Sequence, residues 1–186
     1  LKKSLSRIKE FSLDLETTSI NALDAEIVGI AISYNSDEGF YIPLSHETDI
    51  DQLDLNYVLE NLKEILESSK IKKIGQNLKY EILVFKNYSI NLGGIYFDTM
   101  VASHFLDSSL QSYSLDNLSI RFLDHKMLSY KDITKIEKKE SPFKQVPVDV
   151  AMNYACEESD ITYKLYCIFK DKLLDAIFIA TSTSTH

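Results

Sequence analysis

The sequence lacks several features that would assign it to a broad class at once. No apolar run reaches the length of about 18 residues that a membrane-spanning helix needs, so no membrane partner is expected. No secretory signal precedes the first predicted strand, and the chain has only two cysteines, Cys156 and Cys167. The two lie about 16 Å apart along one predicted helix and cannot pair with each other. This pattern predicts a reduced, cytoplasmic protein.

Basic residues are also fewer than acidic residues. The chain has 20 lysines and arginines against 28 acidic residues, which gives a net charge of −8. Such a chain is poorly suited to gripping duplex nucleic acid through bulk charge. It can still act on a nucleic-acid end if bound metal ions neutralise both the site and the phosphate. The 186 residues, 45% of them apolar, suffice for one domain with a buried core, and a monomer is expected.

Hydrophobic patterning predicts strands first, and then strands that alternate with helices. Strands are expected at 8–15, 26–33, 39–44, 71–75 and 95–97, and helices at 54–68, 78–88, 99–106, 114–123 and from 147 to about 174. Asn77 and Asp98 are expected to cap the second and third helices. This order predicts an α/β domain with a mixed five-stranded sheet flanked by helices, antiparallel in its first three strands and parallel in the last two.

Two stretches fall outside this pattern. Residues 124–146 are rich in lysine and are expected to form an irregular, mobile excursion. Residues 175–186 end in small polar side chains and are expected to be a disordered C-terminal tail.

The first predicted strand carries two acids, Asp14 and Glu16. Because side chains alternate along a strand, both acids project from one face, while Leu13 and Leu15 point into the core. Two neighbouring carboxylates repel each other unless a cation lies between them, and a divalent metal ion is the simplest such cation. On this stretch alone, the alternative that Asp14 opens a turn and Glu16 is solvated stays open.

Two further acids and a tyrosine complete a candidate site. Glu81 lies in the first turns of a predicted helix, and Glu158 follows Tyr154 by four residues on the last helix, so that these two share a face. Four carboxylates balance the charge of two divalent cations, as two-metal phosphodiester hydrolysis requires. A nearby tyrosine hydroxyl can orient the attacking water. Taken singly, Glu81 could be a helix N-terminal acid, Glu158 a solvated one and Tyr154 a core residue.

Several short motifs recur in the order of one known family. They are Asp14-Leu-Glu-Thr17, Val28-Gly29, Tyr41-Ile-Pro43 with His46, Gly75-Gln-Asn-Leu-Lys-Tyr80, Gly94-Ile-Tyr-Phe-Asp-Thr-Met100, Ser114-Leu-Asp-Asn-Leu118 and Tyr154-Ala-Cys-Glu-Glu-Ser-Asp-Ile-Thr162. With them the chain resembles the 3′–5′ proofreading exonuclease domain of bacterial family A DNA polymerases, the polymerase I type. This domain belongs to the tyrosine-bearing branch of the DEDD superfamily. The resemblance spans about residues 8–170 and implies an RNase H-like exonuclease domain over residues 1–174.

The resemblance also implies roles for individual residues. Asp14 would bridge two ions, Mg²⁺ or Mn²⁺, while Glu16 and Glu158 would hold the tighter one. Glu81 would reach the second ion through water, and Tyr154 would position the attacking water. The implied substrate is the 3′ end of single-stranded DNA, released as nucleoside monophosphates, with a polymerase domain in cis or in trans as partner. The positions that match contacts to that 3′ end or its phosphates are Thr17, Gln76, Asn77 and Arg121.

The chain departs from the family at Glu81 and Glu158, where the family has aspartate. Each glutamate keeps the charge and adds one methylene, and a misplacement of about 1 Å can cost roughly a hundredfold in rate. The chain is therefore either an active exonuclease or a weakened, inactive domain that serves a polymerase as a DNA-end-binding or structural module. A tyrosine-branch ribonuclease is a third alternative, which the polymerase-like stretches 75–80 and 97–100 disfavour.

Two interpretations of the lysines also stay open. Lys70, Lys72, Lys73 and Lys79, together with those at 126–144, either guide the phosphates of a frayed strand or form a solvated surface.

Overall fold

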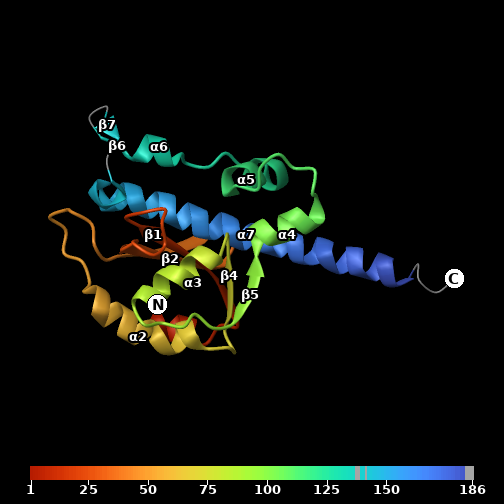
Figure 1. Ribbon diagram of the computed structural model, residues 1–186, viewed down its shortest axis with the longest axis horizontal. Coiled ribbons are helices and arrows are strands. Elements are labelled where there is room, and N and C mark those ends of the chain that lie inside the picture. The colour runs from red at the N-terminus through yellow and green to blue at the C-terminus, as the bar shows by residue number, and fades with distance from the viewer. Residues whose placement is uncertain (137–138, 141, 183–186) are drawn as a thin grey trace.

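A computed structural model describes residues 1–136, 139–140 and 142–182 (Figure 1). Its main sheet has the strand order β3-β2-β1-β4-β5. The strands are β1 (Glu10–Thr17), β2 (Ile27–Asn35), β3 (Glu38–Pro43), β4 (Lys72–Gly75) and β5 (Ile95–Asp98). The first three pair antiparallel, β4 joins β1 in parallel and β5 joins β4 in parallel. The predicted mixed five-stranded sheet is therefore confirmed, although its first strand begins at Glu10 rather than at Ile8.

Helices cover both faces of this sheet (Figure 1). They are α1 (Lys2–Leu5), α2 (Leu55–Glu67), α3 (Lys79–Asn87), α4 (Thr99–Leu106), α5 (Leu115–Leu123), α6 (Tyr130–Ile133) and α7 (Val148–Ser182). Helices α2 and α3 pack on one face, while α7 crosses the other and carries α4, α5 and α6 on its outer side. Among the described residues, none of the helices combines the length and apolarity needed to span a bilayer.

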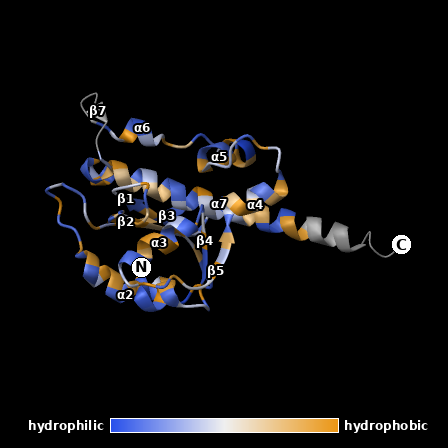
Figure 2. Ribbon diagram, viewed as in Figure 1, coloured by the Kyte–Doolittle hydropathy of each residue, from blue (hydrophilic) through white to orange (hydrophobic). Residues whose placement is uncertain are grey.

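The two faces of β1 have different partners. Phe11, Leu13 and Leu15 are buried in a core shared with α2 and α3. Helix α2 is amphipathic, because hydrophobic and hydrophilic residues are interleaved along it (Figure 2) and its apolar residues share one face. The intervening residues of β1 face α7, and the Ser12 hydroxyl donates a hydrogen bond to the Ser159 carbonyl at 2.7 Å. The face of β1 that carries the acids is thus the one that α7 covers.

Small side chains on β2 extend this face. Gly29, Ala31 and Ser33 pair with Glu16, Asp14 and Ser12, and directly paired residues of a ladder project from the same face. Helix α7 can therefore lie close to the strands, and its side chains reach those of β1.

The predicted cap of α3 is wrong. Asn77 adopts a left-handed conformation, with φ of 65°, and its side chain makes no capping bond. The carboxylate of Asp98 takes over this role, because it accepts from the backbone N–H of Asn77 at 3.2 Å and of Leu78 at 2.8 Å. Asp98 also caps α4, as predicted, by accepting from the N–H groups of Met100 and Val101. One carboxylate therefore ties the starts of two helices together.

Two further expectations need correction. The 124–146 stretch is not wholly irregular, since it contains α6, a two-stranded ladder of β6 (Lys135–Ile136) with β7 (Lys139–Glu140), and a 3₁₀ turn at Phe143–Gln145. The buried side chains of Phe143 and Val146 anchor it. The region after Leu174 remains helical to Ser182, because no glycine or proline interrupts α7. Residues 183–186 lie outside the described part of the chain.

Candidate active site

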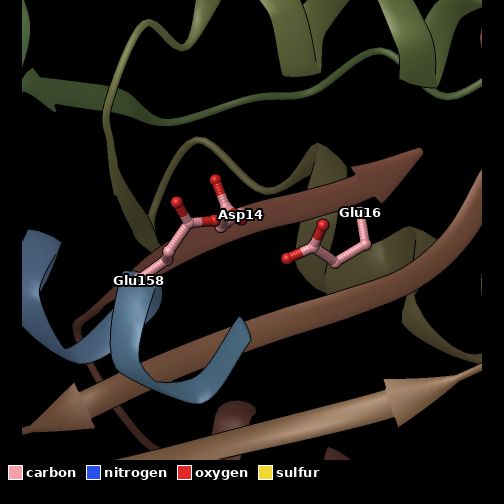
Figure 3. A group of neighbouring side chains, drawn as sticks. All are labelled: Asp14, Glu16 and Glu158. Atoms are coloured by element: carbon pink, nitrogen blue, oxygen red, sulfur yellow. The ribbon is translucent and has the colours of Figure 1, made fainter. Parts of the chain in front are cut away.

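Three carboxyl groups converge where β1 meets α7. Asp14 and Glu16 project from β1 and Glu158 from α7, and the carboxyl group of Glu158 lies beside that of Asp14 (Figure 3). One oxygen of each residue lies within 4.8 Å of the other two. An all-oxygen set of this kind is the coordination that hard divalent cations prefer. Asp14 and Glu16 lie on one face of β1, as the alternation along the strand predicted, and Glu158 reaches them from α7.

A fourth acid approaches from α3. Glu81 lies in the first turn of this helix and is only 4% exposed. It is not one of the three acids that converge within 4.8 Å, but it is close enough for the charge of Asp14 to act on it. One carboxylate oxygen of Glu81 and one of Glu16 are buried with no hydrogen-bond partner in the described part of the chain. Buried anionic oxygens without a partner are costly unless a cation compensates them, so these residues fit a metal site.

In this buried cluster the ionised form of all four acids is disfavoured. Burial raises the pKa of Asp14 to about 6, although a hydrogen bond with Glu158 partly offsets the effect. Burial also raises the pKa of Glu16, Glu81 and Glu158 well above the usual range, and the charge of Asp14 adds to the effect on each. Divalent cations between the carboxylates would reverse these shifts, because they stabilise the ionised forms.

Tyr154 adjoins the acids as the helical spacing predicts. Its hydroxyl donates a hydrogen bond to Glu158 at 2.7 Å, and its side chain is 7% exposed. Burial, and then the negative charge of Glu158, raise the pKa of the Tyr154 phenol above its ordinary value. The hydroxyl therefore keeps its proton and acts as a hydrogen-bonding group rather than as a base.

A cavity of about 410 Å³ opens beside Glu16. It is lined by Leu15, Glu16, Thr17, Thr18, Ser19, Ile20, Asn77, Tyr80 and Tyr130. Two of the residues matched to substrate contacts, Thr17 and Asn77, are thus brought next to the acids. The Thr17 hydroxyl shares a hydrogen bond with that of Tyr80.

The other two predicted contact residues do not line this cavity. The side-chain amide of Gln76 donates to the Tyr113 carbonyl at 2.8 Å and accepts from the Thr99 hydroxyl. The guanidinium of Arg121 pairs with Asp107 at 2.9 Å. Both side chains therefore have partners within the fold.

Two aromatic residues of the cavity had no role in the sequence prediction. Tyr80 belongs to the 75–80 motif and immediately precedes Glu81, which is the signal that could have singled it out. Tyr130 lies on α6, inside the stretch that was expected to be irregular. Sequence alone therefore offered no reason to place it near Glu16.

The lysine cluster at 70–73 differs from the prediction. Lys73 is fully buried and cannot meet a substrate. Its ammonium group donates to the carbonyls of Ile65, Ser68 and Ile71. The ammonium group of Lys72 lies 3.6 Å from the centre of the Tyr96 ring.

The mixed five-stranded sheet flanked by helices defines the class of RNase H-like domains. The 3′–5′ exonuclease family model matches residues 1–174. DNA polymerase I of Pseudomonas aeruginosa is 37% identical over 175 residues, and that of Borreliella burgdorferi is 36% identical over 173 residues. These matches cover 92% and 93% of this chain but 19% and 18% of the relatives. The chain belongs to the 3′–5′ exonuclease family, as its motifs predicted, and spans about a fifth of the length of these relatives.

Solved structures confirm the RNase H-like fold. The structure titled "POL domain of Pol1 from M. smegmatis complex with DNA primer-template and dNTP" has a TM-score of 0.69 at 17% identity, over 93% of this chain and 25% of that one. Brucella melitensis NrnC with bound Mg²⁺ has a TM-score of 0.67 at 16% identity, over 91% of this chain and 76% of that one.

Proposed function

We propose that this domain is a metal-dependent 3′–5′ exonuclease that hydrolyses the terminal phosphodiester of single-stranded DNA and releases nucleoside monophosphates, as in proofreading. The convergence of Asp14, Glu16 and Glu158 within 4.8 Å supports it most strongly. The unpartnered buried oxygens of Glu16 and Glu81 point the same way.

In this proposal Asp14, Glu16 and Glu158 would hold one divalent cation, Mg²⁺ or Mn²⁺, and Glu81 would help to hold a second near Asp14. Divalent cations supply Lewis acidity to such a reaction and neutralise the charge that develops on phosphate oxygens. The carboxylates fix where that charge can be neutralised. Glu158 lies within the group of three acids despite its extra methylene, which favours an active site over a weakened one.

The remaining roles fall to side chains that do not bind metal. The protonated hydroxyl of Tyr154 lies at the edge of the acids, where it can orient a water without taking its proton. The cavity beside Glu16 places Thr17 and Asn77 near the acids and adds the rings of Tyr80 and Tyr130. Aromatic rings can stack on the unpaired bases of both DNA and RNA. The cavity is therefore suited to the last nucleotide of a frayed strand.

DNA is favoured over RNA by the relatives, which are DNA polymerases. A polymerase domain, in cis or in trans, is accordingly the proposed partner. A cytoplasmic location belongs to the same proposal and agrees with the two free cysteines, Cys156 and Cys167.

The test is hydrolysis of a 3′-labelled single-stranded DNA oligonucleotide with Mg²⁺ or Mn²⁺, beside the same reaction in EDTA and an RNA oligonucleotide of equal sequence. We expect metal-dependent loss of the 3′ nucleotide, abolished in Asp14→Ala and Glu158→Ala. Asp160→Asn is the matched control, because this acid lies on the same helix but pairs with Lys164.

Cleavage that survives Asp14→Ala, or RNA cleaved faster than DNA, would contradict the proposal. No cleavage at all would favour the weakened module. The double variant Glu81→Asp with Glu158→Asp then decides whether the two longer side chains are the cause.

A further inference from the structure

Glu157 of α7 ties the connection between α5 and α6 to the long helix. One of its carboxylate oxygens lies 2.8 Å from Nε2 of His125, and the other accepts a hydrogen bond from the backbone N–H of Leu128 at 2.7 Å. Between these two residues, Met127 is buried in an apolar cluster that includes residues of α5 and α7. Successive residues of a helix are about 100° apart, so Glu157 faces a different side of α7 from Glu158. We call Glu157 with its two polar partners the Glu157 clamp.

The clamped connection leads directly into α6. Ser129 follows Leu128, and its carbonyl accepts hydrogen bonds from the backbone N–H groups of Asp132 and Ile133, which close the first turn of α6. Helix α6 has four residues, all of them described, and none of their side chains is fully buried. A helix this short is not stable by itself and depends on what surrounds it. The position of α6 is therefore set by its flanking segments, of which the clamped connection is one.

Tyr130, the first residue of α6, carries this dependence to the cavity beside the acids. The residue lines the cavity and is 45% exposed. Its ring lies nearly parallel to that of Phe143, with the ring centres 6.1 Å apart, and meets the ring of Tyr154 edge-on at 6.2 Å. Tyr130 comes only two positions after Leu128, whose N–H Glu157 holds. A shift of the clamped backbone would thus move the Tyr130 ring with it.

We propose that Glu157 is a positioning residue for the substrate, which sets through α6 where the Tyr130 ring meets the terminal base of a DNA 3′ end. The inference rests on the proposed function, in which that base stacks in the cavity. Glu157 itself contacts neither the base nor the reacting atoms. Its removal loosens the ring and weakens strand binding, while Glu158 and Tyr154 keep their places in the chemical step.

The main test is steady-state cleavage of a 3′-labelled single-stranded DNA oligonucleotide by two variants of Glu157. Glu157→Ala removes both acceptor oxygens and should raise KM about tenfold with kcat little changed, because stacking of one base contributes about that factor. Glu157→Gln keeps an acceptor for the Leu128 N–H and should have a KM close to that of the unmodified protein. A glutamine variant with as high a KM as the alanine variant would mean that charge acts on the strand, and it overturns the proposal.

Asp160→Ala is the matched control. Asp160 lies on the same helix, accepts a hydrogen bond from the backbone N–H of Asp37 at 2.8 Å and pairs with Lys164. It therefore makes the same kinds of bond as Glu157 but ties a different segment to α7. We expect its removal to leave KM unchanged, and a KM raised as much as in Glu157→Ala overturns the proposal.

A second substitution shows whether the effect passes through Tyr130. Tyr130→Leu keeps an apolar side chain but has no ring to stack on a base, so it should raise KM by itself. Combined with Glu157→Ala it should raise KM no further, because no ring is left to position. Additive effects of the two substitutions overturn the proposal, as does a Glu157→Ala variant with lowered kcat and unchanged KM.

Hydrogen exchange measures the clamp without substrate or metal. In Glu157→Ala the backbone amides of residues 128–134 should exchange about tenfold faster than in the unmodified protein, which is the effect of losing one charge-assisted hydrogen bond. Thermal unfolding establishes that each variant is folded. Unchanged exchange in a protein that cleaves DNA overturns this inference and leaves the proposed function intact. Faster exchange in a protein that cleaves no DNA would show the clamp but overturn its part in substrate binding together with the proposed function.

Discussion

Asp14→Asn should stabilise the protein without metal and remove its stabilisation by metal. The pKa of Asp14 is about 6 in the folded chain against an ordinary value of 3.8. The folded state therefore holds this proton more tightly than the unfolded state, and stability falls as pH rises through the window between these two values. Above pH 7 the folded protein carries the full cost of an ionised Asp14, which asparagine does not impose.

The size of this effect follows from the shift. At about 1.4 kcal/mol per pKa unit, moving Asp14 from 3.8 to about 6 costs about 3 kcal/mol at pH 7.5. For a domain of this length that free energy corresponds to roughly 6–12 °C in the unfolding midpoint. The difference should shrink to about 0.5 kcal/mol near pH 4, where Asp14 is protonated in the folded state, and vanish below the ordinary pKa of 3.8. The asparagine amide can still donate to Glu158, so little packing is lost.

The assay is thermal unfolding of both proteins between pH 4 and 7.5, in EDTA and in Mg²⁺. In EDTA at pH 7.5 Asp14→Asn should unfold at the higher temperature. In Mg²⁺ at about a hundred times its Kd the unmodified protein should gain about 2.7 kcal/mol, while the variant gains little, so that the gap closes. A variant less stable than the unmodified protein in EDTA at pH 7.5 would refute the claim that burial makes the ionised form of Asp14 costly when no cation is bound.

Three further substitutions test separate parts of the structure. Lys73→Met leaves one buried and two partly buried carbonyls without this donor and should cost about 3 kcal/mol in urea unfolding; an unchanged midpoint would contradict the role of this ammonium group. Tyr154→Phe removes the hydroxyl that donates to Glu158 and should lower kcat by about a hundredfold with little change in KM, so equal kcat values would exclude a part in orienting water. Gly29→Ala forces the Tyr41 hydroxyl to move and should destabilise the fold by about 1–3 kcal/mol in the same urea assay, whereas wild-type stability would mean that the two positions are not in contact.

Local rules predicted the parts of the site that lie on one element. Alternation along β1 placed Asp14 and Glu16 on one face, and the helical repeat paired Tyr154 with Glu158, because each rule depends only on residues a few positions apart. The meeting of β1 with α7 joins residues far apart in the sequence, and no spacing rule reaches that far. It was anticipated only through the order of the family motifs.

The failed predictions share a physical cause. Asn77 is a good capping residue by type, but the carboxylate of Asp98 reaches the same N–H groups from another element. The close approach of the Tyr41 hydroxyl to Gly29, which pairs with Glu16, depends on ladder register, which composition does not reveal. Long-range partners therefore decided each case in which the local signal was misleading.

The bond between the Ser12 hydroxyl and the Ser159 carbonyl joins the first strand to the last helix. During translation β1 leaves the ribosome long before α7, and at roughly 5–20 residues per second the interval is on the order of ten seconds. Throughout that time Asp14 and Glu16 lack the carboxylate of Glu158. A nascent or prematurely terminated polypeptide thus cannot assemble the group of three acids, and the proposed nuclease activity would require chains whose synthesis has passed α7.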